Sequence, residues 1–306
     1  MRKGQKFTQK KMLRWREIGR GTGAGADYTA WHRVSRDDPG SRGSSYWLPT
    51  IGHTRHADLL SDLERVASMF ARMLPGLLEE REQFPLQTGL HQGLDEHGYE
   101  RVFDPFSGTA NIAKKLGFRH PRHRDLGSEK ALWVMSTDIL LFQNSDTDKV
   151  GKKKYLAVSV KPFNVIHKKR VRELLLIEKM YWNWQGIPWL LITEETYDDR
   201  VRESLMKFSA HAFGLDPLPQ TLLTKIAKVV LAKSEGLLAS RLDSIQASLN
   251  CNQQTAQAGF WQAVWKGLIP VNLAKVGWPT NPVEIISAQD FWLQNPIVSR
   301  RSSWME

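Results

Sequence analysis

The sequence predicts an α/β domain built on a mixed β-sheet, followed by a mainly α-helical domain. Three observations predict this fold class. Runs of aliphatic, aromatic and β-branched residues indicate strands, apolar residues at helical spacing flank those runs, and the pattern beyond about Leu215 is almost entirely helical. With 306 residues, of which 41% are hydrophobic, the chain has enough material for two cores. We place the boundary near residue 214, which gives domains 1–214 and 215–306.

The first predicted elements lie before residue 87. Residues 1–50 are basic and irregular. An amphipathic helix is expected from Ala57 to Met73, and Pro75 with Gly76 ends it. Its apolar stripe is Leu60, Leu63, Ala67, Phe70 and Leu74. The stretch "LLEEREQFPL" then indicates a strand.

The rest of the first domain completes the sheet. Residues 87–130, rich in Gly, His and Pro, are expected to be an insertion between core strands. "WVMSTDILLF" and "KYLAVSVKP" predict an antiparallel hairpin with a polar turn between them. A helix follows from about Val165 to Trp184, and "IPWLLIT" predicts a short buried strand. The order helix, three strands, helix, strand indicates a mixed sheet.

The second domain reads as three helices, "PQTLLTKIAKVVLAKS", "LASRLDSIQASLN" and "QQTAQAGFWQAVWKGL", and a hairpin in "IPVNLAKVGWPTNPVEIIS". That order suits a winged-helix module. The third helix carries the aromatic and apolar face Phe260, Trp261, Val264 and Trp265, which favours core packing and protein contact over reading of a DNA groove. The closing "DFWLQNPIVSRRSSWME" is expected to be a tail that folds against a partner.

Charge and cysteine content narrow the function classes. The net charge of +11 indicates a polyanionic partner, most simply nucleic acid. No run of 18 apolar residues predicts a membrane span, and the basic start has no apolar stretch behind it. Cys251 is the only cysteine, which excludes an intrachain disulfide and a cysteine-based zinc cluster. We therefore expect a cytoplasmic protein.

The predicted hairpin brings an acid and a lysine together. Asp138 and Lys161 fall at the end of the ladder away from the turn, and the period of two puts Ser159 on the same face as Lys161. Such a patch could hold Mg²⁺ through Asp138 and an oxygen of Ser159 or Val160, while Lys161 orients water or balances charge. This is the PD-(D/E)xK nuclease arrangement. A structural ion pair between Asp138 and Lys161 fits the spacing as well.

A second acid would be needed for the nuclease reading, and two glutamates are candidates. Glu64 borders the apolar stripe of the first helix, and Glu178 lies four residues after Leu174 on the later helix. Either could equally be a surface glutamate, so spacing alone leaves the second acid open.

Six stretches together resemble the TnsA family, the endonuclease subunit of heteromeric cut-and-paste transposons. In chain order they are "GRGTGAGADYTAW", "LLSDLE", "EREQFPL", "VMSTD", "VKP" and "IEKMYWNWQGIPWLLIT". The resemblance covers roughly residues 10–200. It implies a restriction-endonuclease-like catalytic domain with Glu64, Asp138 and Lys161 in the active site and Glu178 at a further acidic position. The family has Gln where this chain has Ser159, which puts the direct metal ligands in question.

The resemblance also implies an activity and partners. TnsA-like proteins cut the 5′ strands at transposon ends, a TnsB-like DDE transposase cuts and joins the 3′ ends, and a TnsC-like AAA+ regulator couples both to target choice. The implied cofactor is Mg²⁺, with Mn²⁺ as a substitute, held by Glu64, Asp138, Ser159 and Val160. Basic residues near the site are expected to contact DNA phosphates. They are Arg20, Lys152, Lys153, Lys168, Lys169 and Arg170.

Three other functions stay open at this stage. A non-catalytic assembly subunit would bridge DNA, transposase and regulator with a weakened site. A free-standing restriction-type nuclease would cut without partners. "VFDPFSGTANIA" resembles the motif of methyltransferases that bind S-adenosylmethionine, but it lacks the preceding strand and the second catalytic motif. The glycine-rich "GRGTGAG" has no strand before it and no Gly-Lys-Ser/Thr after it, so a DNA-contacting loop or a plain linker is expected there.

Overall fold

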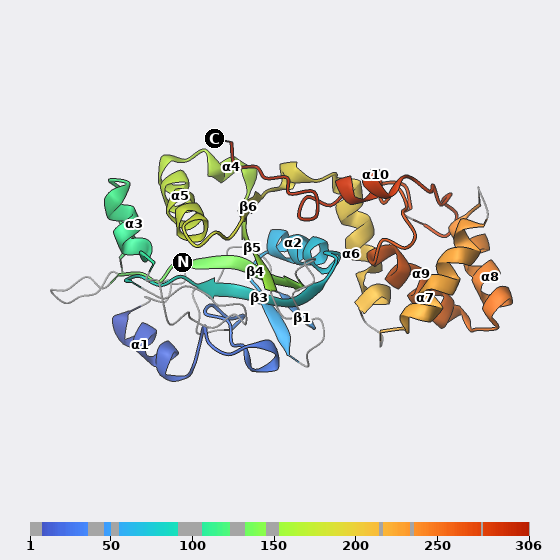
Figure 1. The fold of residues 1–306 in the computed structure, drawn as a ribbon, viewed down its shortest axis with the longest axis horizontal. Coiled ribbons are helices and arrows are strands. Elements are labelled where there is room, and N and C mark those ends of the chain that lie inside the picture. The colour runs from blue at the N-terminus through green and yellow to red at the C-terminus, as the bar shows by residue number, and fades with distance from the viewer. Residues whose placement is uncertain are drawn as a thin grey trace, which may run out of the picture. The chain divides into compact units, whose positions relative to one another are not determined.

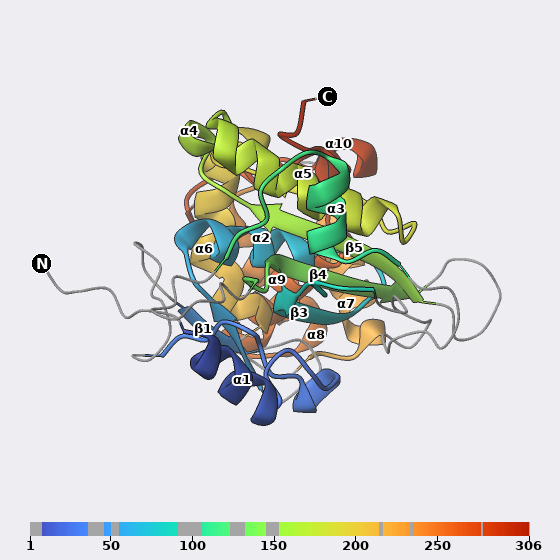
Figure 2. The same ribbon diagram turned by 90° about the vertical axis from the view of Figure 1, so that its left-hand side faces the viewer.

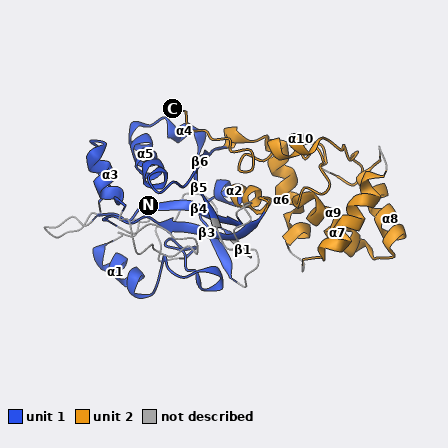
Figure 3. Ribbon diagram, viewed as in Figure 1, with its two compact units in different colours: residues 1–65, 76–193, 306 blue, residues 66–75, 194–305 orange. Residues whose placement is uncertain are grey.

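The computed structural model describes residues 8–35, 46–49, 55–90, 106–122, 132–144, 153–213, 217–232, 236–276 and 278–305. Packing divides the chain into two compact units (Figure 3). The first comprises residues 1–65, 76–193 and 306, and the second comprises residues 66–75 and 194–305. This division follows Thr193, and the domain boundary expected near residue 214 stays a prediction.

The first unit is built on a mixed four-stranded sheet, as the sequence predicts. Its strands are β3 (Leu77–Pro85), β4 (Ser136–Asn144), β5 (Lys153–Val160) and β6 (Trp189–Ile192), in that spatial order. The first two pairings are antiparallel, and β5 with β6 is parallel. A separate antiparallel pair joins β1 (Tyr46–Pro49) to β2 (His56–Leu59).

The central strands are apolar on both faces because both faces are covered. Residues 137–142 of β4 and all of β6 are buried. Helix α5 (Lys169–Asn183) lies over one face of the sheet, and the N-terminal segment with α1 (Gln9–Glu17) lies over the other (Figures 1 and 2). Such double cover explains why these strands lack the polar alternation of a half-exposed sheet.

Helix α1 corrects the expectation that residues 1–50 are irregular. Thr8 caps it by accepting a hydrogen bond from the backbone N–H of Lys11 at 3.3 Å. Its apolar side chains Met12 and Trp15 form a buried cluster with Trp31 and Val134. The segment Gln9–Glu17, which we expected to be irregular, is therefore an amphipathic helix with a basic surface and a short apolar face.

The helix expected from Ala57 to Met73 was placed too early. Residues 56–59 form strand β2, and helix α2 runs only from Asp62 to Arg72. Ser61 and Glu64 fix the start, because the Ser61 hydroxyl accepts from the Glu64 N–H at 3.2 Å and also contacts the Glu64 carboxylate. This S-x-x-E capping pattern outweighs the helical spacing of the apolar residues before it.

Helices α3 (Thr109–Lys115) and α4 (Phe163–Ile166) and one 3-10 turn are further elements of the first unit. The helix expected over Val165–Trp184 is two helices, α4 and α5, because Lys168 has an extended backbone (ψ 126°) between them. Helix α3 falls in the region expected as an insertion, of which residues 91–105 and 123–131 lie outside the described chain. A single 3-10 turn, η1, covers Gly25–Asp27.

The second unit is mainly helical, as expected. Besides residues 66–72 of α2, its described residues contain the turn η2 (Glu194–Thr196) and five helices. These are α6 (Asp199–Phe213), α7 (Gln220–Leu231), α8 (Leu238–Leu249), α9 (Gln253–Trp265) and α10 (Ala288–Leu293). Helix α9 is the central one: residues 258–265 are all buried, and Trp261 stacks on Phe208 with ring centroids 3.9 Å apart.

The structure changes three details of that unit. Phe260, Trp261, Val264 and Trp265 are core residues, so no free aromatic face exists there for a partner. Within the described residues, the two arms of the expected hairpin share one bridge, between Val271 and Ile285, and Pro282 bridges Leu237. The closing segment packs on its own unit, with Phe291, Asn295 and Ile297 all fully buried. The winged-helix assignment stays a prediction.

Among the described residues, no helix is long and apolar enough to span a membrane.

Candidate active site

The predicted pairing of Asp138 and Lys161 is present at the open end of the β4–β5 ladder. The last paired residues are Ile139 and Val158. Beyond them, the Asp138 carboxylate accepts the backbone N–H of Val160 at 2.6 Å and the Lys161 ammonium at 2.7 Å. The same ammonium donates to the Val160 carbonyl at 2.9 Å. The carboxylate thus takes the place of a ladder partner and holds the lysine against the strand end.

Glu64 reaches the same place from the first turn of α2. Its carboxylate accepts the Leu60 N–H at 2.9 Å and the side-chain amide of Gln83 at 3.1 Å. Gln83 lies opposite Asp138, between the pairs Glu82–Ile139 and Phe84–Thr137, so this bond brings Glu64 to the end of the sheet where Asp138 and Lys161 meet. Only 7% of Glu64 is exposed. Glu64 is therefore buried and not the surface glutamate that spacing alone allowed, and its role in the candidate site stays a prediction.

The carboxylates of the site crowd one another. Burial, and after it the charge of Asp138, raise the pKa of Glu64 to about 7. Burial lowers the pKa of Lys161, but Asp138, Glu178 and Glu64 outweigh that effect, so the net shift is upward. Lys161 thus stays charged, with 36% of its side chain exposed. A site of this kind favours an additional positive charge.

Glu178 lies deeper and is held by hydroxyl groups. Its Oε1 accepts from Thr137 at 2.7 Å and from Ser159 at 2.6 Å. Trp182 and Trp189 in turn donate to Thr137 and Ser159, at 2.7 Å and 2.9 Å. Burial, then Asp138, raise the pKa of Glu178 to about 7. The Ser159 hydroxyl is thus engaged in a buried network, and its role as a metal ligand stays a prediction.

The donor set suits a hard divalent cation. No three Asp, Glu, His or Cys side chains form a metal-binding cluster within the described residues. Mg²⁺, however, often takes only one or two protein carboxylates and completes its shell with water and substrate oxygens. Glu64, Asp138 and the Val160 carbonyl are oxygen donors, and the mutual repulsion of the two acids is what a cation would relieve. The residues therefore fit Mg²⁺.

The basic residues expected to contact DNA are in different situations. Lys168, Lys169 and Arg170 are exposed at the start of α5, shortly after Lys161 in the chain, and Arg170 pairs with Glu173 at 2.9 Å. Lys152 and the side chain of Lys153 lie outside the described residues. The DNA contacts expected of these residues stay a prediction.

Arg20 and the glycine-rich segment around it support the sheet. The Arg20 guanidinium lies over the ring of Trp15 and donates to the Trp31 carbonyl at 3.3 Å. Downstream, the hydroxyl of Tyr28 donates to the Glu82 carbonyl at 2.9 Å, and the Trp31 N–H to the Gln83 carbonyl at 3.2 Å. We call residues 19–31 the N-terminal strap, because they bind along β3.

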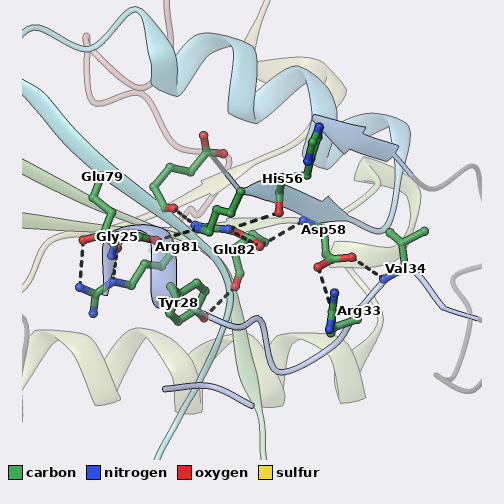
Figure 4. A network of polar contacts seen from close by, with 11 residues as sticks. Gly25, Tyr28, Arg33, Val34, His56, Asp58, Glu79, Arg81 and Glu82 are labelled. Carbon is green, nitrogen blue, oxygen red and sulfur yellow. Dashed lines mark hydrogen bonds and ion pairs between the residues drawn. The ribbon is translucent and has the colours of Figure 1, made fainter. Parts of the chain in front are cut away.

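A buried ionic network lies between the strap and strands β2 and β3 (Figure 4). The Arg55 guanidinium donates to both carboxylate oxygens of Glu82 at 2.9 Å, and Arg81 pairs with Glu79 at 2.7 Å. The Gly25 N–H donates to Glu79 at 2.6 Å, and the Asp58 N–H to Glu82 at 3.1 Å. These contacts join the strap and β2 to β3, so the network anchors the strap.

Gln83 is a site residue that sequence reasoning did not single out. It lies within the "EREQFPL" stretch, but a glutamine inside an acidic strand gives no chemical signal of its own. Its backbone φ of +48° is visible only in the structure.

Comparisons with known proteins show what this sequence is similar to. Residues 96–194 match the family model described as TnsA-like endonuclease N terminal. The span includes Asp138, Lys161 and Glu178 and begins after Glu64. The chain is also 30% identical over 199 residues to the transposon Tn7 transposition protein TnsA of Escherichia coli, an alignment that covers 65% of this chain and 62% of that protein. The alignment thus spans less than two thirds of that relative.

Proposed function

We propose that this chain, a member of the TnsA family through the region that these matches cover, is a metal-dependent DNA endonuclease of a cut-and-paste transposition complex. In this proposal it cuts the 5′, non-transferred strands at transposon ends, while a TnsB-like DDE transposase acts on the 3′ ends and a TnsC-like AAA+ regulator couples both to target choice. The observation that carries the proposal is the meeting of Glu64, Asp138 and Lys161 at one end of the sheet.

Phosphodiester hydrolysis needs a polarised phosphate and an oriented water. Bound Mg²⁺ would act as a Lewis acid on the phosphate oxygens. Glu64 and Asp138, with the Val160 carbonyl, would hold that ion. The ammonium of Lys161, fixed by Asp138 and the Val160 carbonyl, would orient the attacking water or stabilise the charge that develops on the phosphate. Lys168 and Lys169 would contact neighbouring phosphates.

The test is strand-specific cleavage of labelled transposon-end DNA with Mg²⁺ and the partner transposase. Wild-type protein should release the 5′ strand. Asp138→Ala should leave only the nick at the 3′ end that the transposase makes. Equal products from both proteins would contradict a nuclease role.

One observation favours a second candidate, a non-catalytic assembly subunit. In this structure Lys161 is paired directly with Asp138, and Glu64 is engaged in capping α2, so each group also has a structural partner. Under that candidate, Asp138→Ala would leave assembly and cleavage products unchanged, which the same experiment measures.

A further inference from the structure

Gln83 has an unusual backbone for its position. It lies within β3 and has a φ of +48°, in the left-handed region that costs a non-glycine residue roughly 1–2 kcal/mol. The neighbouring residues Glu82 and Phe84 pair with Ile139 and Thr137 of β4. Gln83 therefore stands opposite Asp138, at the point where the strand departs from regular geometry.

The N-terminal strap holds this departure in place. The Gln83 carbonyl accepts the N–H of Trp31 at 3.2 Å, and the Tyr28 hydroxyl holds the preceding carbonyl, that of Glu82, at 2.9 Å. Strained residues of this kind persist where the surroundings fix them, and they concentrate at functional sites. The strap thus supplies, from outside the site, the contacts that keep Gln83 in its conformation.

The side chain of Gln83 links two groups of the site. Its amide nitrogen donates to Oε2 of Glu64 at 3.1 Å, and its amide oxygen accepts from the Ser136 hydroxyl at 3.2 Å. Only 3% of the residue is exposed. Because the Ser136 hydroxyl donates to the oxygen, the amide is oriented with its N–H groups toward Glu64. Among the described contacts of Glu64, this one comes from outside its own helix and the turn before it.

We propose that Gln83 is a positioning residue that holds the carboxylate of Glu64 beside Asp138 in the orientation needed to bind the divalent cation. The inference rests on the proposed function and deepens it. Partners that orient metal-binding carboxylates typically change metal affinity 10–100-fold when they are removed. The glycine-rich strap then serves the site through β3.

The test uses Gln83→Asn in the full chain. Asparagine tolerates the left-handed backbone better than glutamine, but its side chain is one methylene shorter and falls short of Glu64. The variant should keep the wild-type unfolding midpoint while its dissociation constant for Mn²⁺, measured by calorimetry without DNA, rises about tenfold or more. Gln83→Leu, which removes both hydrogen bonds, should weaken Mn²⁺ binding at least as much.

Gln143→Asn is the matched control, because Gln143 lies at the far end of β4, where it pairs with Lys154. It should bind Mn²⁺ like wild type. Wild-type affinity in Gln83→Asn, together with loss of binding in Asp138→Ala, would overturn the positioning role alone. A wild-type chain that neither binds Mn²⁺ nor cuts DNA would overturn the proposed function, and this inference with it.

Discussion

At the scale of single residues, the first prediction is that metal binding depends on pH. Burial and the charge of Asp138 raise the pKa of Glu64 to about 7. A carboxylate must lose its proton to bind a metal, so metal affinity should fall as the pH falls below about 7. We expect the dissociation constant for Mn²⁺ to rise about tenfold per pH unit there. Calorimetric titrations between about pH 5.5 and 8 measure this slope. A dissociation constant independent of pH across that range would show that no proton is displaced.

Glu178 gives a separate, metal-free prediction. Its pKa is raised to about 7 in the folded chain, so the stability linked to its proton is fully present below the unfolded pKa and is lost as the pH rises through 7. Glu178→Gln keeps an acceptor for Thr137 and Ser159 but cannot ionise. Relative to wild type, its free energy of unfolding should therefore improve by roughly 1 kcal/mol per pH unit between about pH 5.5 and 7.

Urea unfolding of both proteins in chelator checks this prediction. Glu173→Gln, a change at a glutamate on the same helix that pairs at the surface with Arg170, serves as the control and should show no such trend. If the difference in free energy of unfolding between Glu178→Gln and wild type does not change with pH, folding does not shift the pKa of Glu178.

The residue scale also shows how far the sequence could lead. Asp138 and Lys161 followed from strand alternation, because an antiparallel ladder brings them together whatever the details. Glu64 needed the family resemblance, although the "SDLE" capping pattern places it in the first helical turn. Gln83 could not be predicted, since a positive φ on a glutamine depends on contacts made by residues about 50 positions away.

At the scale of elements, the N-terminal strap should act through its fit against β3. Gly21 has a φ of +77°, and a Cβ there would collide with the ring of Pro85. Gly117 has a similar φ of +69° but nothing within 4 Å of an added Cβ. Gly117→Ala should cost about 1–2 kcal/mol from backbone strain alone, and Gly21→Ala about 1–3 kcal/mol more from overpacking. Denaturant unfolding of the two variants separates these costs. Equal losses of stability would mean that Gly21 is not packed tightly against Pro85 of β3.

The ion pair between Arg55 and Glu82 makes a second prediction at this scale. Glu82 is fully buried, and Arg55→Met would leave its carboxylate without that partner, at a cost of about 3–5 kcal/mol near neutral pH. The loss should shrink at lower pH, because burial already raises the pKa of Glu82 to about 7 and the protonated side chain carries no charge. Adding Glu82→Leu should recover most of the loss, as measured by a double-mutant cycle. Full additivity of the two changes would contradict a direct coupling.

Elements followed from the sequence where the local pattern and the tertiary packing agreed. Strands β3 to β6 and helices α7 to α9 lie where the sequence places them. Helix α2 did not start where expected, since Ala57 and Leu59 are buried in a strand and only by coincidence continue its apolar spacing. Helix α1 was missed because its apolar face is short and packs on Trp31 and Val134, which lie further along the chain.

At the scale of the whole molecule, the chain crosses between its units within α2. The first turn of that helix carries Glu64 in the first unit, whereas residues 66–75 pack in the second. Phe70 contacts Tyr197 with ring centroids 5.3 Å apart, Arg72 lies over Phe213, and Asn295 donates to the Phe70 carbonyl at 2.8 Å. The sequence could not predict that residues 66–75 pack in the second unit, because their contact with Asn295 joins parts of the chain that are far apart in sequence.

This crossing predicts how truncation will behave. A fragment of residues 1–193 removes every second-unit partner of residues 66–75 and exposes Phe70, which is fully buried in the intact chain. A fragment of residues 1–213 keeps Tyr197 and Phe213 and loses Asn295. We expect the shorter fragment to aggregate and the longer one to stay soluble with a lower unfolding midpoint than the full chain. Because α2 also positions Glu64, the midpoint and the Mn²⁺ affinity should fall together across the series. A 1–193 fragment as soluble, as stable and as tight for Mn²⁺ as the full chain would show that the first unit builds its site alone.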